Sequence, residues 1–92
     1  MKVTLRFFAR FGEIFGNSRE IDAPGGTSVA GLVREAAGTS IEGYRAVFQE
    51  TGSFQEYVIL MRNRKRISAQ DAETTIIAEG DEIAVFPPVA GG

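Results

Sequence analysis

Residues 80–92 read GDEIAVFPPVAGG and carry the most information about the fold. After a Gly-Asp turn pair, the segment Glu82–Phe86 alternates, with Ile83 and Val85 on one side, as in a half-buried strand. Two prolines then stop further sheet pairing, because proline has no backbone N–H and fixes φ. The stretch therefore predicts a last strand that leaves the sheet as an extended tail ending in two glycines.

The tail ends in a Gly91-Gly92 carboxylate, preceded by the small residue Ala90. Glycine has no Cβ, so such an end can enter a narrow channel and meet a nucleophile without side-chain hindrance. The residues after Phe86 reach at most about 20 Å when fully extended. A frayed terminus also collects small residues, but the stiff Pro87-Pro88 approach favours a reacting tail.

The sequence contains no cysteine and no histidine. It therefore lacks a thiolate nucleophile, an imidazole base, a Ser-His-Asp relay, and the ligands of a thiolate-based zinc or iron-sulfur site. Two groups of carboxylates lie in polar, turn-like stretches, where a solvated face is a better interpretation than an acid/base pair. These groups are Asp71 with Glu73, and Glu79 with Asp81 and Glu82. We expect a chain that is not an enzyme and binds no metal.

The 92 residues, 43% of them hydrophobic, are enough for one small domain with a single core;. A net charge of −2 and a pI near 5.1 argue against a dedicated nucleic-acid binder;. Charged residues interrupt the apolar residues of the first segment, 1–15, so it predicts neither a signal peptide nor a membrane span. The absence of cysteines is compatible with a reducing compartment, and we expect a soluble, cytoplasmic protein that is monomeric when free.

The N-terminal segment Lys2–Phe7 alternates and predicts a strand, with Phe8 falling on its polar face;. Residues 9–15 have the spacing of a short helical turn, and residues 18–23 predict a weak edge strand antiparallel to the first. If the first and last strands are neighbours, Phe8 and Phe86 form an apolar patch at the root of the tail. Either a partner grips this patch or a helix of the same domain covers it.

A Pro-Gly-Gly breaker precedes a helix predicted from a cap at Thr27 or Ser28 to about Ala37;. Its apolar stripe consists of Val29, Leu32, Val33 and Ala36. Gly31 lies inside this helix and suggests a close packing contact, since glycine weakens a helix. Gly38 is expected to end the helix in a left-handed conformation.

The middle of the chain is less informative. Residues 41–50 predict a short second helix, and the continuous apolar run at 57–61 predicts a buried strand whose inward-facing residues periodicity does not decide;. Residues 62–66 form a basic turn that either docks on an acidic partner or is simply solvated. A short strand near Ile67 and a loop at 68–73 are expected to follow.

This order of elements predicts an α+β domain, in which one main helix packs across a mixed sheet of four to five strands. A β-grasp arrangement satisfies the order, with the first and last strands parallel at the centre, although other α+β topologies fit as well. We expect the domain to span residues 1–86 and a flexible Gly-Gly tail to span residues 87–92.

The stretch at 80–92, together with Phe7-Phe8-Ala9-Arg10, resembles two related families with a ubiquitin-like β-grasp fold. These are the MoaD-type small subunits of molybdopterin synthase and the archaeal ubiquitin-like small modifier proteins. Thiamin-pathway sulfur carriers of the ThiS type share the fold and the Gly-Gly end, but are typically shorter and lack the Pro-Pro element.

The resemblance implies that an E1-like adenylyltransferase uses ATP and magnesium to activate the Gly92 carboxylate, while the chain itself holds no cofactor. Gly92 would then become a thiocarboxylate that delivers sulfur within molybdopterin synthase, against its large subunit, or would form an isopeptide bond with lysines of target proteins. The alternatives are a dedicated synthase subunit only, and a non-covalent interaction domain with an inert tail. The resemblance makes Gly91 and Gly92 the reacting residues, and the expected partner-binding residues are Phe8, Phe86, Pro87, Pro88, Val89 and Ala90.

Overall fold

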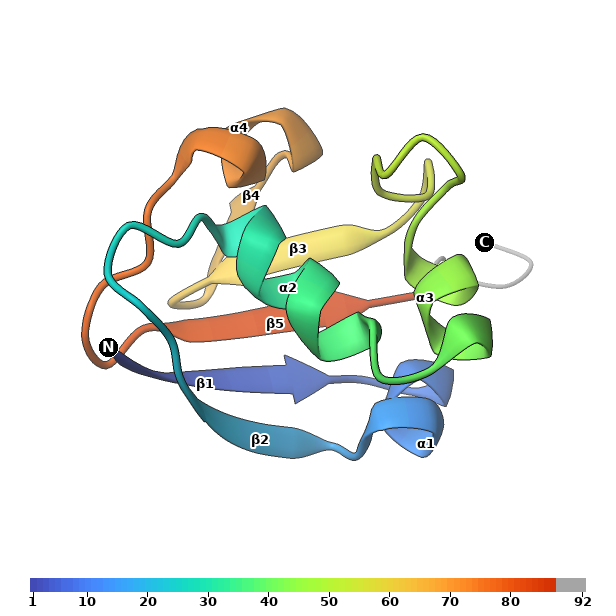
Figure 1. Cartoon of the computed structure of the whole chain (residues 1–92), viewed down its shortest axis with the longest axis horizontal. Helices are drawn as coiled ribbons and strands as arrows, with labels where there is room; N and C mark the ends of the chain where they lie inside the picture. Colours follow the sequence, from blue (N-terminus) through green and yellow to red (C-terminus); the bar gives the residue numbers. More distant parts are fainter. Residues whose placement is uncertain (88–92) are drawn as a thin grey trace.

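A computed structural model describes residues 1–87 as a five-stranded sheet with helices packed against it (Figure 1). The strands are β1 (Lys2–Phe7), β2 (Ser18–Asp22), β3 (Ile59–Arg62), β4 (Lys65–Ile67) and β5 (Glu82–Phe86). The helices are α1 (Arg10–Phe15), α2 (Val29–Ala37), α3 (Ile41–Val47) and α4 (Ala69–Thr74). The predicted α+β architecture, with a mixed sheet and one main helix across it, is confirmed.

The first and last strands lie side by side in the middle of the sheet, as the sequence predicts. The strand order is β2-β1-β5-β3-β4, and β1 pairs with β5 in parallel with Leu5 opposite Ile83 and Phe7 opposite Val85. Both other neighbours of this central pair are antiparallel. Since β5 is hydrogen-bonded on both sides, its C-terminal end is held firmly at one end of the sheet.

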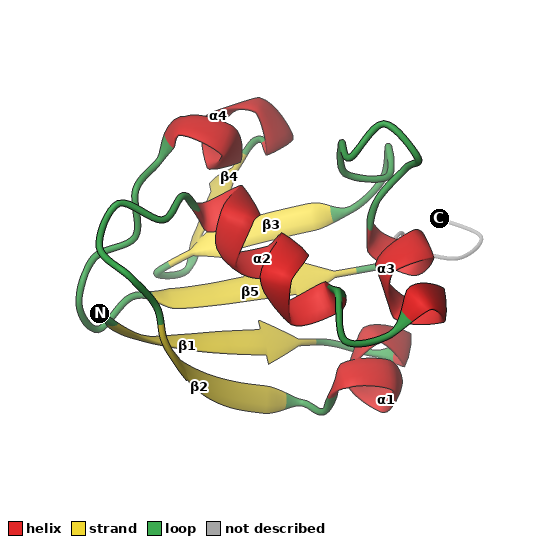
Figure 2. Ribbon diagram, viewed as in Figure 1, coloured by secondary structure: helices red, strands yellow, loops and turns green. Residues whose placement is uncertain are grey.

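Helix α2 lies across one face of the sheet (Figure 2). It begins at Ser28, whose hydroxyl accepts a hydrogen bond from the Gly31 N–H at 3.0 Å, and this bond satisfies one of the free N–H groups of the first turn;. A Cβ at Gly31 would lie 3.1 Å from that same hydroxyl, so the close contact of this glycine is with the helix cap. The side chains of Val3, Leu5, Phe7, Leu32, Val33, Leu60, Ile83 and Val85 form the centre of the core.

Two local predictions are wrong. Residues 68–73 were expected to be a loop, but α4 occupies most of that segment, beginning with a cap in which Ser68 Oγ accepts from Asp71 N–H at 3.0 Å. Ala72 is its one fully buried side chain, so the segment has no apolar stripe to reveal the helix;. Gly38 ends α2 with φ −67°, in the right-handed region rather than the left-handed one.

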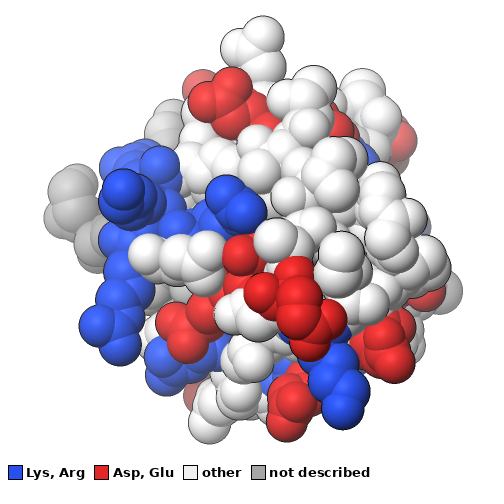
Figure 3. Space-filling model, turned by 90° about the vertical axis from the view of Figure 1, so that its left-hand side faces the viewer, with Lys and Arg blue, Asp and Glu red and all other residues white. Residues whose placement is uncertain are grey.

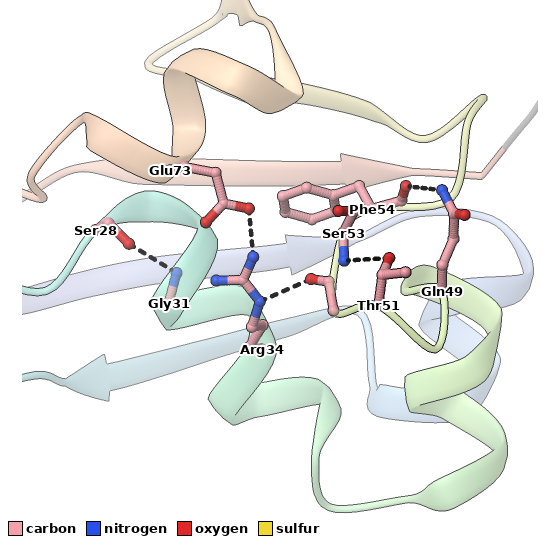
Figure 4. A network of polar contacts seen from close by, with 9 residues as sticks. Ser28, Gly31, Arg34, Gln49, Thr51, Ser53, Phe54 and Glu73 are labelled. Carbon is pink, nitrogen blue, oxygen red and sulfur yellow. Dashed lines mark hydrogen bonds and ion pairs between the residues drawn. The ribbon is translucent and has the colours of Figure 1, made fainter.

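The segment between α2 and β3 is tied to the rest of the domain by Arg34 (Figure 4). Its Nε donates to the Gly52 carbonyl at 3.0 Å, and its guanidinium also pairs with Glu73 of α4. The same group lies over the Phe48 ring, 5.4 Å from the centroid. One side chain on α2 therefore fixes both the loop after α3 and the position of α4.

Helices α1 and α3 meet at a glycine. A Cβ placed on Gly43 would lie 2.5 Å from two ring atoms of Phe15 and 2.9 Å from Ile14 Cγ2. The Phe15 ring has little room to move away, because its centroid lies 4.5 Å from that of the Phe7 ring in the core. The helix predicted at 41–50 is shorter than expected and ends at Val47, after which Phe48 bridges to Phe54.

Candidate functional site

Phe8 and Phe86 stack on each other at the end of the central strand pair. Their ring centroids are 4.3 Å apart with an interplanar angle of 12°. Phe8 N–H donates to Val85 O at 3.1 Å, which continues the parallel ladder one step beyond β1. Both rings are half-buried and lie on the sheet face opposite α2;. Helix α2 therefore does not cover the rings.

The stack belongs to a larger apolar surface, which we call the open-face patch and define as Phe8, Ile59, Met61, Ala84 and Phe86. Strand pairing places Ile59 opposite Phe86 and Met61 opposite Ala84, so these side chains share one face. Sequence reasoning missed Ile59 and Met61, because the unbroken apolar run at 57–61 conceals which residues point inward. Leu60, with 1% of its surface exposed, is the member of β3 that faces the core.

Charged side chains border the patch on the β1 side. The Arg6 guanidinium lies over the Phe8 ring, 4.9 Å from its centroid, and pairs with Glu82 at 3.8 Å. Both members of this pair are substantially exposed, so the pair itself adds little stability. An apolar centre with a polar rim is the arrangement of a protein-docking surface. The patch therefore has the composition of a docking surface.

Asp81 anchors the turn that leads into β5. Its carboxylate accepts from Arg62 Nε at 3.0 Å, Asn63 Nδ2 at 2.9 Å and Ala78 N–H at 2.8 Å. Burial alone would raise the pKa of Asp81, but the hydrogen bonds from Asn63, Ala78 and Arg62 outweigh it and hold the pKa below the ordinary value of 3.8;. Only 5% of Asp81 is exposed. The prediction that this residue belongs to a solvated face with Glu79 and Glu82 is therefore wrong for Asp81.

The remaining carboxylates of the two groups are exposed or contact other parts of the chain, and Glu82 pairs with Arg6. Asp71, Glu73 and Glu79 are exposed, and Glu73 pairs with Arg34 of α2. Glu79 accepts a hydrogen bond from the Lys2 backbone N–H at 2.9 Å. Within the described range 1–87, His, Cys, Asp and Glu side chains form no cluster of three or more suited to a metal ion.

A tight turn carries the basic residues between β3 and β4. Asn63 and Arg64 have φ of 51° and 69°, the left-handed pair that a two-residue type I′ hairpin requires. Arg64, Lys65 and Arg66 are exposed and form no ion pair with any described residue. Figure 3 looks at this end of the molecule and shows Lys and Arg gathered along one side of it.

Of the predicted reacting tail, the structure describes Pro87. Pro87 is half-buried at the end of β5, whereas the predicted site residues Pro88, Val89, Ala90, Gly91 and Gly92 lie outside the described residues. The structure therefore brings together Phe8, Phe86 and Pro87 at the root of the tail.

No helix in the described part of the chain is long and apolar enough to cross a membrane.

Comparisons with known proteins agree with this architecture. The sequence profile of the ThiS family matches residues 5–92. Small archaeal modifier protein 3 of Haloferax volcanii is 30% identical over 92 residues, with 100% of both chains covered. A molybdopterin synthase sulfur carrier subunit of Aedes aegypti is 37% identical over 93 residues, covering 100% of this chain and 90% of that protein. The crystal structure of small archaeal modifier protein 1 of H. volcanii matches with a TM-score of 0.82 and 25% identity, covering 96% of this chain and 98% of that one.

Proposed function

Because this chain belongs to the ThiS family, we propose that it is a ubiquitin-like carrier whose Gly92 carboxylate is activated by an E1-like adenylyltransferase and then transferred. Its relatives are named as small archaeal modifier proteins and as a sulfur carrier subunit. The catalytic groups belong to the partners, and this chain supplies a docking surface and a C-terminal tail. We expect it to act in the cytoplasm.

Activation proceeds by attack of a Gly92 carboxylate oxygen on the α-phosphorus of ATP. A phosphorus–oxygen bond forms, pyrophosphate with its magnesium ion leaves, and the product is an acyl-adenylate. This step exchanges a poor leaving group on the carboxyl carbon for a good one, AMP. Glycine at the last two positions leaves the carboxyl carbon unhindered.

The acyl-adenylate has two fates. If a sulfur donor transfers sulfide to the carboxyl carbon, AMP leaves and Gly92 becomes a thiocarboxylate. If a lysine ε-amine is the final acceptor, the bond to AMP breaks, AMP leaves, an amide forms and the amine loses a proton. We include both outcomes, because the relatives carry both kinds of name. Candidate partners are the large subunit of molybdopterin synthase for the first fate and target proteins for the second.

The observation that carries the proposal is the position of the open-face patch. Its aromatic members are the last residue of β5 and the residue that extends β1, and Pro87 follows the stack directly. An enzyme that binds the patch therefore holds the root of the tail, with Gly92 within about 20 Å of it. A dedicated synthase subunit would use the same surface for one partner only, whereas an interaction domain with an inert tail would not need Gly92.

Hydroxylamine trapping tests the activation step directly. Acyl-adenylates react with hydroxylamine to give a C-terminal hydroxamate and AMP, whatever the later fate of the carrier. Purified wild-type protein would be incubated with extract of its native cells, ATP, magnesium and hydroxylamine, and its intact mass measured. We expect a hydroxamate at Gly92 that depends on ATP.

The matched controls separate activation from binding. A variant lacking Gly91 and Gly92 keeps the whole described domain, and we expect it to form no hydroxamate. If wild-type protein also forms none, in extract of cells that are using the pathway, the carrier proposal is wrong. If the truncated variant still supports the phenotype of the native cells, the chain is an interaction domain with an inert tail.

A further inference from the structure

Strand β2 is an edge of the sheet (Figure 1), so half of its backbone polar groups point away from β1. At the two ends of the β1–β2 ladder, Phe7 N–H donates to Asn17 O at 3.1 Å and Ala23 N–H donates to Met1 O at 2.8 Å. The pairing in between is uninterrupted, and bonded pairs alternate with non-bonded pairs in an antiparallel ladder. The residues whose N–H and C=O groups point outward are therefore Ser18, Glu20 and Asp22.

This outward edge is available for pairing. Within residues 1–87, no hydrogen bond outside the ladder involves the backbone of Ser18, Glu20 or Asp22. Such an edge is a template for another strand. The opposite edge, β4, is only three residues long and begins with Lys65 and Arg66, which are features that discourage strand addition. The two edges of the sheet are therefore not equivalent.

An apolar hollow runs beside β2, between this strand and α2. Its volume is about 190 Å³, and its apolar lining comes from Ile21 of β2 and from Leu32 and Ala36 of α2, with Arg19, Glu35 and Thr39 completing the lining. A strand added to β2 would direct every second side chain towards the α2 side of the sheet, where the hollow lies. Branched aliphatic side chains suit such a site, because they are compact and favour extended backbone.

Charged side chains around the β2 edge determine which charge an added strand should carry. Arg19 is engaged, since its guanidinium donates to Phe15 O at 2.7 Å, and Asp22 pairs with the N-terminal amine at 3.3 Å. Glu20 and Glu35 are exposed and have no ion pair with any residue in 1–87. Opposite charges facing each other across paired strands are favourable, whereas like charges are unfavourable. A strand with a basic residue opposite Glu20 is therefore favoured.

A second copy of this chain is a poor occupant of the edge. Antiparallel pairing through all three outward residues would place Glu20 directly opposite the same residue of the second copy. The shifted register that pairs Glu20 with the other copy's position 22 again opposes two carboxylates. Like-charge pairs of this kind destabilise a ladder, and the other shifted register, with Glu20 opposite Ser18, provides Glu20 with no opposite charge, so the edge favours a different chain.

We infer that the β2 edge and the hollow beside it bind an extended segment of another protein, in which a basic residue lies between two branched aliphatic residues. The segment adds a sixth strand to the sheet, its aliphatic side chains enter the hollow, and its basic side chain faces Glu20. This surface lies on the edge of the sheet away from β3, and its use does not require the Gly92 carboxylate. Strand β1 separates this edge from β5, which leads into the tail.

The direct test is an amide NMR titration with the peptide Lys-Thr-Val-Lys-Val-Thr-Lys, which reads the same in both directions and so fits either strand orientation. We expect shifts at residues 18–22 and in α2, with half-saturation at or below about 1 mM. We also expect slower hydrogen exchange at the amides of Ser18, Glu20 and Asp22, because pairing protects them. The control peptide Lys-Val-Thr-Lys-Thr-Val-Lys has the same composition but places threonine in the hollow, and it should bind more weakly.

Two variants separate strand addition from general charge attraction. Ser18→Pro removes an outward N–H without removing a ladder bond or a charge, and should abolish protection at Glu20 and Asp22. Glu20→Lys should weaken the lysine-centred peptide about two- to fivefold and favour a glutamate-centred one. Absence of shifts at β2 in wild-type protein would overturn the inference, as would equal binding of both peptides. Exchange at the three amides that stays unchanged at saturation would overturn it too, and retained amide dispersion confirms that each variant is folded.

Discussion

Replacement of Asp81 by asparagine should destabilise the domain strongly, although the two side chains have nearly the same shape. The carboxylate accepts three hydrogen bonds, from Arg62, Asn63 and the Ala78 N–H. Asparagine offers one acceptor oxygen and a donating amide group. If its oxygen keeps the bonds from Arg62 and Ala78, its amide group faces the amide donor of Asn63.

Asn63 cannot resolve this conflict by rotating its amide. Its own Oδ1 accepts a hydrogen bond from Glu82 N–H at 2.9 Å, and a rotation would break that bond at the start of β5. The substitution therefore removes a charge-assisted hydrogen bond and leaves a donor unsatisfied in a site that is 5% exposed. Together these effects amount to about 2–4 kcal/mol of unfolding free energy, allowing for the partial exposure of Arg62.

Urea unfolding followed by far-ultraviolet circular dichroism measures this difference, since the chain has no tryptophan to report it. In heat unfolding followed by the same signal, we expect a thermal midpoint lower by about 4–8 °C for each kcal/mol lost. The exposed control Asp22→Asn should change stability by no more than about 0.5 kcal/mol. A comparably small effect of Asp81→Asn at neutral pH would refute the reasoning.

The same substitution has a defined pH dependence. The pKa of Asp81 in the folded protein lies below its ordinary value of 3.8, so the ionised group contributes stability that is fully present above that value. This contribution is lost as the pH falls through the lower, folded-state pKa. We therefore expect the difference between wild type and Asp81→Asn to shrink as the pH is lowered below 3.8. An unchanged difference at that acidity would contradict the role of the charge.

Three further substitutions test other parts of the structure. Arg64→Gly should stabilise the domain by about 0.5–1 kcal/mol in urea unfolding, because φ is 69° there and glycine adopts that region without strain;; a loss of stability would contradict the turn geometry. Gly43→Ala should lower the free energy of unfolding by about 1–2 kcal/mol in the same assay, because overpacking against the Phe15 ring exceeds the gain in helix propensity. Unchanged stability would show that α1 moves to make room for the new Cβ. Phe86→Ala should reduce hydroxamate formation about tenfold or more while the circular dichroism spectrum stays native; unchanged trapping would exclude the open-face patch as the docking surface.

The parts of the fold with strong periodicity were predictable from the sequence. Residues of β1 and β5 alternate between apolar and polar, and α2 carries a continuous apolar stripe. The structure confirms the two strands, the helix and the parallel pairing of β1 with β5. Helix α4 was not predictable, because Ala72 is its one buried side chain and tertiary contact with α2 decides its conformation. Periodicity fails in the same way for Ile59 and Met61, which lie in an unbroken apolar run.

Site residues were predictable from the sequence only where a local pattern, such as strand alternation, indicates their position. The neighbouring positions of Phe8 and Phe86 follow from alternation once the two strands are paired. The buried state of Asp81 does not, because its partners Arg62 and Asn63 are 19 and 18 positions away in the sequence. Hydrogen bonds between distant residues leave no local pattern, so a carboxylate in a polar turn resembles a solvated one.

The most direct test of the carrier function is intact and peptide mass spectrometry of tagged protein recovered from its native cells without reducing or alkaline treatment. The account predicts a free species in which one C-terminal oxygen is replaced by sulfur, Gly-Gly branches on lysines of other proteins, or both. The first result alone identifies a sulfur carrier, and the second identifies a protein modifier. An unmodified Gly92 carboxylate with no adducts, in cells that are using the pathway, would contradict the central claim.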